Sequence, residues 1–153
     1  FMKTRSAIFS VVVILAVLVL ASSSAALCVT VSKANLRSGP GKGHDVAWQV
    51  YRYMPLEKVG QSTDKRWYAV RDCDGDTYWI HRSLVTHGYR CAVVKVEKAR
   101  VRKGPGTRYS TVKDSPALKY YTYRVISSKK NWLRLRDEWG DTGWIRKDLL
   151  WIK

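Results

Sequence analysis

The chain repeats itself at an offset of 65 residues, and this repeat constrains its fold more than any other feature. Lys33 to Gly41 shares six residues with Lys98 to Gly106. Trp67 to Leu84 shares nine residues with Trp132 to Leu149. Between these blocks the offset between matching residues changes from 65 to 66 and then returns to 65. Loops tolerate such a change, whereas paired strands resist it. The sequence therefore predicts two copies of one structural unit.

Each copy has the pattern of short strands separated by Gly, Pro and Asp clusters, and after residue 26 no stretch keeps a helical period. The strands expected in the first copy are Val29–Val31, Val46–Tyr51, Leu56–Val59, Trp67–Arg71 and Thr77–Ile80. Regularly spaced short strands in a unit of about 60 residues are typical of small closed or nearly closed barrels. The predicted fold class is all-β, with two tandem small barrels.

The stretch "WYAVRDCDGDTYWI" is the clearest hairpin, because Asp74 and Gly75 supply the turn between two alternating strands. Alternation turns Tyr68 and Val70 toward the core. The residues expected to face outward are Trp67, Ala69 and Arg71. In the second copy Leu133 and Leu135 are expected inside, and Trp132, Arg134 and Arg136 outside.

The N-terminus has the pattern of a secretory signal peptide spanning residues 1–26. Lys3 and Arg5 precede an apolar run that ends at Ala21, and small residues lead to a cleavage site after Ala26. A retained membrane anchor is the alternative, although the apolar run is short for a transmembrane helix. We expect an exported protein of the periplasm or cell envelope, without a stable membrane span after cleavage.

Cleavage would lower the formal net charge from +16 to +14, so the exported chain stays strongly basic. Such a charge favours anionic polymers, namely envelope glycans and phosphates, anionic lipid or nucleic acid, and export disfavours nucleic acid. The simpler interpretation of the charge is a solvated basic surface.

Three cysteines, Cys28, Cys73 and Cys91, allow one disulfide and one free thiol in an oxidising compartment. The sequence cannot choose among the three pairings. We take Cys73 with Cys91 as the hypothesis, because these residues lie eighteen positions apart around the junction between the copies. Their spacing does not fit a metal site, and no metal or other cofactor is expected.

Two motifs that suggest chemistry are better explained as turns. "RSGPG" and "RKGPG" lack the spacing of a phosphate-binding loop, and Lys42 is replaced by Thr107 in the second copy. "DCDGD" has its glycine at the fourth rather than the sixth place of a calcium loop, and no glutamate closes it. Arg37 and Arg102 either touch a ligand or brace their turns.

The stretches "ANLRSGPG" and "RWYAVRDCDGDTYWIHRSLV", repeated as "ARVRKGPG" and "NWLRLRDEWGDTGWIRKDLL", resemble the bacterial SH3-like domain. The resemblance covers nearly all of the chain after residue 26. It implies domains at 27–86 and 91–153 joined by a linker at 87–90. It also implies a non-catalytic role, most often attachment to cell-wall glycan or peptide.

The same resemblance suggests Trp67 and Trp132 as ligand-face residues, and Ile80 and Ile145 as core. Leu84 and Leu149 stand where a eukaryotic SH3 domain carries a tyrosine, which disfavours proline-rich ligands. Six further aromatic residues fall where the middle strands are expected: Trp48, Tyr51, Tyr53, Tyr120, Tyr121 and Tyr123. Alternation sends about half of them into the core. The others, with the outward tryptophans and arginines, suit sugar rings and carboxylates or phosphates. The candidate ligand-binding residues are Arg37, Tyr53, Trp67, Arg71, Trp79, Arg102, Trp132, Arg134, Arg136 and Trp144.

Catalysis is not expected. A cysteine peptidase would need a histidine beside its thiol, and only His81 or His87 lies near Cys73 in the sequence. The second copy replaces Cys73 and His81 with Glu138 and Arg146. The sequence therefore predicts a binding protein for a cell-envelope component, with peptidoglycan as the favoured ligand. The alternative is an interaction or assembly factor that binds another envelope protein.

Overall fold

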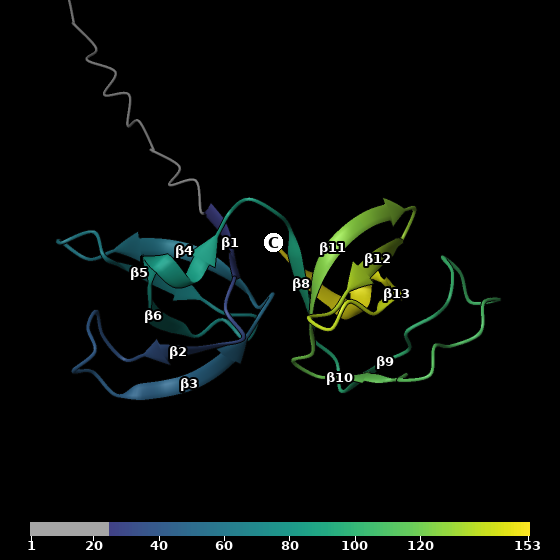
Figure 1. Ribbon diagram of the computed structural model, residues 1–153, viewed down its shortest axis with the longest axis horizontal. Helices are drawn as coiled ribbons and strands as arrows, with labels where there is room; N and C mark the ends of the chain where they lie inside the picture. Colours follow the sequence, from purple (N-terminus) through teal and green to yellow (C-terminus); the bar gives the residue numbers. More distant parts are fainter. Residues whose placement is uncertain (1–24) are drawn as a thin grey trace, which may run out of the picture.

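The computed structural model describes residues 25–153, which fold into β-strands joined by turns and form two lobes (Figure 1). The helical segments among these residues are two single turns of 3-10 helix, η1 (Arg82–Leu84) and η2 (Lys147–Leu149). The predicted all-β fold class is therefore confirmed.

The N-terminal domain, residues 25–86, is an antiparallel sheet of seven strands in the order β3-β2-β6-β5-β4-β1-β7. Its strands are β1 (Ala25–Val29), β2 (Lys33–Arg37), β3 (Val46–Tyr51), β4 (Pro55–Gln61), β5 (Trp67–Arg71), β6 (Thr77–His81) and β7 (Val85–Thr86). Alternate apolar side chains point into one core, where Leu36, Leu56, Val70 and Ile80 are fully buried. Ile80 and Val70 are thus core residues, as predicted.

The C-terminal domain, residues 91–153, has a five-stranded sheet in the order β13-β12-β11-β8-β14 and a separate pair, β9 and β10. Its strands are β8 (Cys91–Val94), β9 (Lys98–Ala99), β10 (Ala117–Leu118), β11 (Thr122–Lys129), β12 (Trp132–Arg136), β13 (Thr142–Arg146) and β14 (Leu150–Ile152). Leu133, Leu135 and Ile145 are buried in its core, as the alternation predicted.

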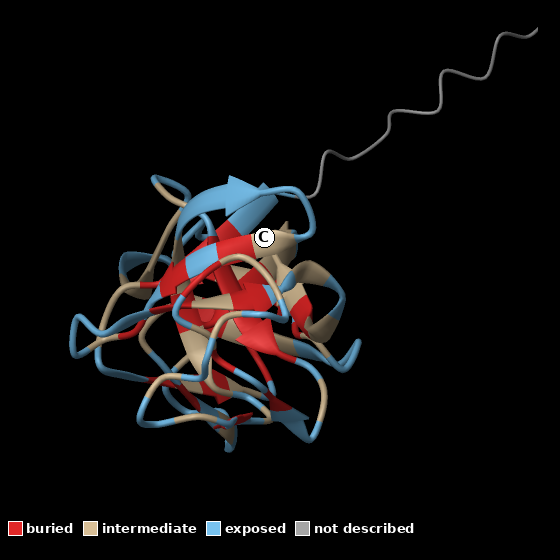
Figure 2. Cartoon of the chain, turned by 90° about the vertical axis from the view of Figure 1, so that its right-hand side faces the viewer, coloured by how far each residue is buried: buried red, intermediate tan, exposed pale blue. Residues whose placement is uncertain are grey.

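Neither sheet closes completely. Within residues 25–153 the end strands β3 and β7 are not paired with each other, and neither are β13 and β14. Buried segments nevertheless gather at the centre, and exposed segments lie at the periphery, in loops and at the ends of some strands (Figure 2). Both sheets are therefore open, and among the described residues the strands do not form a closed barrel.

The repeat is visible in the backbone hydrogen bonds, but its slip is larger than predicted. The amide of Tyr53 donates to the carbonyl of Val29, and the amide of Tyr120 donates to that of Val94. These tyrosines are 67 residues apart, so the matching slips by two residues, not one. The offset returns to 65 in the turn between β11 and β12. Four residues separate the paired Ser128 and Leu133 there, whereas six separate the equivalent pair Gln61 and Tyr68 between β4 and β5. The changes lie outside the shared strands, as the sequence suggested.

The predicted signal peptide lies almost wholly outside the described residues. Strand β1 begins at Ala25, and Ala25 and Ala26 pair with Lys58 and Glu57. Cleavage after Ala26 would remove these two pairings and leave the buried part of β1 in place. Residues 25–153 contain no helix with the length and apolar character of a transmembrane span.

The predicted pairing of Cys73 with Cys91 is wrong. The disulfide joins Cys28 in β1 to Cys91 in β8, with the two Cα atoms 6.0 Å apart, and Cys73 is free. Proximity along the chain was the wrong guide, because Cys73 lies in the turn between β5 and β6. The fold instead brings the first strands of the two domains together.

Candidate functional site

The two arginines of the RxGPG loops brace the loops themselves. A guanidinium nitrogen of Arg37 donates to the carbonyls of Lys42 and His44, at 3.2 and 2.8 Å. Arg102 donates in the same way to the carbonyls of Thr107 and Tyr109, at 3.0 and 2.8 Å. These contacts support the interpretation of the loops as structural turns.

The first glycine of each loop makes room for a ring. A Cβ atom on Gly39 would overlap the imidazole of His44, and one on Gly104 would overlap the phenol of Tyr109. Glycine is therefore required here because a ring packs on the backbone, and not because a phosphate approaches it.

The "DCDGD" stretch is the hairpin turn between β5 and β6, as predicted. One oxygen of the buried Asp72 carboxylate accepts the amides of Asp74 and Asp76, both at 2.9 Å. Burial raises the pKa of Asp72. Asp137 holds the turn between β12 and β13 by the same two kinds of bond. Residues 25–153 contain no group of three His, Cys, Asp or Glu side chains placed to hold a metal ion.

A groove recurs in both domains at matching positions. We call these depressions the N-terminal groove, of about 350 Å³, and the C-terminal groove, of about 250 Å³. Seven positions line both, each pair 65 residues apart: Lys33 and Lys98, Asn35 and Arg100, Arg37 and Arg102, Lys42 and Thr107, Trp67 and Trp132, His81 and Arg146, Leu84 and Leu149. The duplication thus preserved a surface feature as well as a fold.

The grooves are cationic. The N-terminal groove is lined by Lys33, Arg37 and Lys42, and neither groove is lined by Asp or Glu. The C-terminal groove is lined by Lys98, Arg100, Arg102 and Arg146. Cations around a partly apolar floor suit carboxylate or phosphate groups, since charge-assisted hydrogen bonds are the stronger ones.

The groove tryptophans are less accessible than predicted. Trp67 lies on the expected face of β5 but is only 8% exposed, and its ring meets the His81 ring edge-to-face at 5.3 Å. Ala69, on the same face, is also 8% exposed. Trp132 is half-buried and lies opposite Arg146 in the strand pairing. Trp67 was predicted to be exposed to solvent. This prediction is wrong, because His81 on the neighbouring strand covers the indole.

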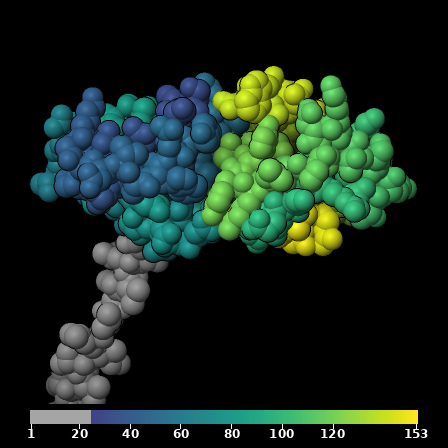
Figure 3. Space-filling view, turned by 90° about the horizontal axis from the view of Figure 1, so that it is seen from below, coloured from purple at the N-terminus to yellow at the C-terminus, as the bar shows by residue number. Residues whose placement is uncertain are grey.

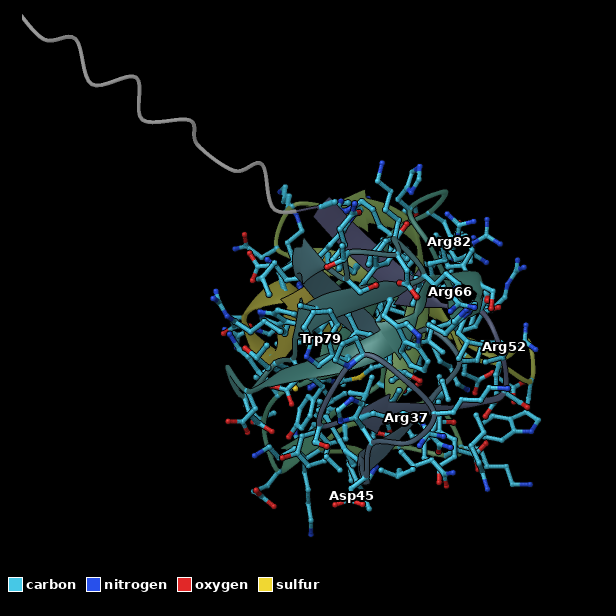
Figure 4. All side chains as sticks on the ribbon, turned by 90° about the vertical axis from the view of Figure 1, so that its left-hand side faces the viewer. Arg37, Asp45, Arg52, Arg66, Trp79 and Arg82 are labelled. Carbon is cyan, nitrogen blue, oxygen red and sulfur yellow. A yellow bond between two sulfur atoms is a disulfide. The ribbon has the colours of Figure 1, made fainter. Side chains whose placement is uncertain are left out.

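Two further candidate tryptophans lie beside the loop arginines. Trp79 pairs across the sheet with Arg37 and with Ala69. Figure 4 labels Arg37 and Trp79 in a view onto the outer end of the N-terminal domain. Trp144 pairs with Arg102 and with Arg134. Both indoles are half-buried. The structure therefore brings these candidates next to the grooves.

The remaining candidates lie elsewhere. Arg71 and Arg136 end their strands, exposed, and Arg71 is 3.7 Å from the carboxylate of Glu57. Arg134 is exposed on β12. Tyr53 lies at the junction between the domains, where its ring meets the ring of Tyr89 at 5.9 Å. These four side chains do not line either groove.

A larger cleft lies between the two domains, and four of the aromatic residues expected on the middle strands line it: Trp48, Tyr51, Tyr120 and Tyr121. This interdomain cleft has a volume of about 500 Å³. It is lined by Trp48, Gln49, Val50, Tyr51 and Met54 from the N-terminal domain, and by Lys119, Tyr120, Tyr121, Thr122, Glu138 and Trp139 from the C-terminal domain. The lobes meet along one boundary (Figure 3).

Contacts across the junction hold the walls of this cleft. The hydroxyl of Tyr120 donates to Asp74 at 2.7 Å, which raises the pKa of Tyr120, and its ring meets the Trp48 ring edge-to-face at 5.3 Å. Thr122 donates to the carbonyl of Arg52 at 2.6 Å. The Cys28–Cys91 disulfide adds a covalent link. The two walls of the cleft are therefore joined by hydrogen bonds, a ring contact and a disulfide between the domains.

One break in the repeat is the sequence signal for this cleft. Trp139 occupies the turn position that Asp74 holds in the first copy, and its side chain is 71% exposed. The turn is held through the backbone amide of residue 139, so it does not require a tryptophan there. Trp139 was not among the residues expected to bind a ligand.

Cys73 does not have the properties of a catalytic thiol. Burial, with Asp74 and Asp72 nearby, raises its pKa to about 11, whereas nucleophilic cysteines have lowered pKa values. The Nδ1 atom of His81 lies 2.7 Å from the Ser83 hydroxyl and accepts from the Ser83 amide. This pair therefore offers no support for peptidase chemistry.

Comparison with known proteins identifies the repeated unit. The model of the bacterial SH3 domain family matches residues 30–86 and again residues 95–151. No curated protein matches the chain.

The solved structures that match the chain share little sequence with it. NlpC2 from Trichomonas vaginalis is 13% identical with a TM-score of 0.36, over 86% of this chain and 49% of that one. An NlpC/P60 family protein from Bacillus cereus ATCC 10987 is 12% identical with a TM-score of 0.37, over 84% and 56%. The chain spans about half the length of these proteins.

Proposed function

Because the chain belongs to the bacterial SH3 domain family, whose members commonly bind cell-wall components, we propose that it is an exported, non-catalytic protein that binds peptidoglycan. The signal-peptide pattern of residues 1–26 supports export. The observation that carries the proposal is the pair of grooves lined by the same seven positions in both domains.

The chemistry of the grooves fits the anionic groups of a wall polymer. Cationic side chains surround each tryptophan, and no acidic side chain lines either groove. Carboxylates of the peptide stems are the matching ligand groups. Two weak sites on one chain reinforce each other when their separation matches a repeating polymer.

The test is sedimentation with purified insoluble peptidoglycan over a salt series. The protein is expected to sediment at low salt and to be released progressively as salt screens the charges. Charge reversal of the matched groove residues, Lys33→Glu with Lys98→Glu, is expected to weaken binding about tenfold or more.

Lys65→Glu with Lys130→Glu is the control. These two lysines are exposed, occupy the β4–β5 and β11–β12 turns, and line neither groove. This pair changes the net charge by the same amount. No sedimentation of the unaltered protein at low salt would overturn the proposal. Equal losses in the two double variants would show that binding depends on overall charge and not on the grooves.

A further inference from the structure

The exposed aromatic residues of the molecule converge on one place. Among residues 25–153, the large apolar side chains with the greatest exposure include three aromatic ones: Tyr51 at 49%, Tyr120 at 38% and Trp139 at 71%. All three line the interdomain cleft. Large exposed apolar surface that gathers in one depression marks a binding site more often than a structural accident.

The cleft also differs from the grooves in charge. Its lining includes one cation, Lys119, and one anion, Glu138, in a protein with a formal net charge of +16. Lys119 is itself 3.8 Å from the carboxylate of Asp74. The anionic groups that suit the grooves would find little compensating charge here. A ligand with no net charge is favoured.

The polar groups on the lining suit a sugar. The Glu138 carboxylate and the Thr122 hydroxyl, which donates its proton to the Arg52 carbonyl, offer hydrogen-bond acceptors beside the aromatic rings, and Lys119 offers donors. The apolar faces of pyranose rings pack on aromatic rings, and their hydroxyl and acetamido groups need such polar partners. A volume of about 500 Å³ lies within the ordinary range of small-ligand sites.

The walls are in place before any ligand arrives. Trp48 contacts Tyr120, and Tyr121 contacts Trp139 with ring centroids 6.4 Å apart. The Tyr121 hydroxyl donates to Asp137, the residue that holds the turn carrying Trp139. Fixed rings lose little freedom on binding, so even modest contacts contribute to affinity.

We propose that the interdomain cleft binds the uncharged N-acetylated sugar rings of the wall glycan, with Trp139 and Tyr51 as stacking platforms. This inference rests on the proposed function for the choice of glycan. It assigns the glycan to the cleft and leaves the anionic stem groups to the grooves.

The probe is the tetramer of β-1,4-linked N-acetylglucosamine, added to the purified protein and followed by the NMR signals of the indole N–H groups. The expected result is saturable shifts of the Trp139 and Trp48 signals, with the Trp67 and Trp132 signals unmoved. Cellotetraose, which lacks the acetamido groups, is expected to bind more weakly.

Trp139→Ala is expected to weaken binding of the tetramer about tenfold, and Trp139→Phe to restore most of it. Folding should survive the change, because Trp139 is exposed and its turn is held through its backbone amide. Leu118→Ala is the control, since Leu118 is 57% exposed and lies outside the cleft.

Each outcome separates the two proposals. Sedimentation with peptidoglycan but no shift of the Trp139 signal with the tetramer would overturn the cleft assignment and leave the wall-binding proposal standing. Shifts confined to the groove tryptophans, or equal affinity in Trp139→Ala and Leu118→Ala, would also overturn it. Failure of both assays would overturn both proposals.

Discussion

Cys28 in β1 and Cys91 in β8 are joined by a disulfide, so the first strand of one domain is covalently attached to the first strand of the other. The four-residue segment between Thr86 in β7 and Cys91 provides the second connection. The ion pair of Lys153 with Glu57, at 3.7 Å, lies across the same junction. Two domains held in these ways are expected to move as one body.

The first prediction concerns this bond. Cys28→Ser with Cys91→Ser is expected to lower the free energy of unfolding by about 2–4 kcal/mol, because the bond closes a long loop in the unfolded chain. Urea unfolding of the oxidised protein and of the double variant measures the difference. Peptide mass mapping without reduction should show Cys28 linked to Cys91, and a link involving Cys73 would contradict the structure.

The second prediction concerns the glycine under each ring. Gly39→Ala and Gly104→Ala are each expected to destabilise the protein by about 1–3 kcal/mol, because the added methyl group must displace the ring of His44 or Tyr109. Gly43→Ala is the matched control, since a Cβ atom there meets nothing within 4 Å. Thermal unfolding measures all three variants, and equal behaviour of the three would exclude the proposed packing.

The third prediction concerns the buried carboxylates of the hairpin turns. Asp137→Ala is expected to cost about 1–3 kcal/mol of unfolding free energy, since it leaves two amides without their acceptor. Asp141→Ala serves for comparison, because Asp141 is exposed and contributes its backbone to the turn. Urea unfolding should show a clear loss only in the first variant.

The fourth prediction concerns the free thiol. The pKa of Cys73 is about 11. At pH 8 the fraction of Cys73 present as thiolate is therefore about a hundredfold or more below that of an ordinary thiol. Reaction with a disulfide reagent should be slow in the native protein and should accelerate as pH rises toward 11. Fast reaction at pH 8, comparable to that of the protein in guanidinium chloride, would contradict the raised pKa.

The fifth prediction concerns export. The mature protein should begin at Leu27, which the intact mass of the exported protein determines. Loss of Ala25 and Ala26 removes two pairings at the exposed end of β1, so the trimmed and untrimmed chains should unfold within about 0.5 kcal/mol of each other. A mass that retains residues 1–24 would support the anchor alternative instead.

The fold was predictable because its signals are local and occur twice. Alternation predicted the buried positions of Val70, Leu133 and Leu135, and the turn chemistry predicted the hairpins. The disulfide was not predictable, because three cysteines permit three pairings and only the packing of β1 near β8 selects one.

The candidate site was predictable only in part, for a similar reason. The repeat led to Trp67, Trp132 and the loop arginines, and these do line the grooves. Strand alternation predicts which face a side chain is on, but not that a neighbour such as His81 will cover it. The interdomain cleft depends on how the two domains pack against each other, and the sequence pattern within one copy does not predict that packing.

The turn between β12 and β13 shows how such a protein can acquire a new specificity. Asp137 supports the turn through the backbone amides of Trp139 and Asp141, so the turn does not require a particular side chain at its tip. The copy that carries Asp74 at this tip and the copy that carries Trp139 have the same hairpin, although the Asp74 side chain also bonds Tyr120 across the junction. Substitution at this single position could therefore retarget the cleft in evolution, or in a designed library, while the scaffold stays unchanged.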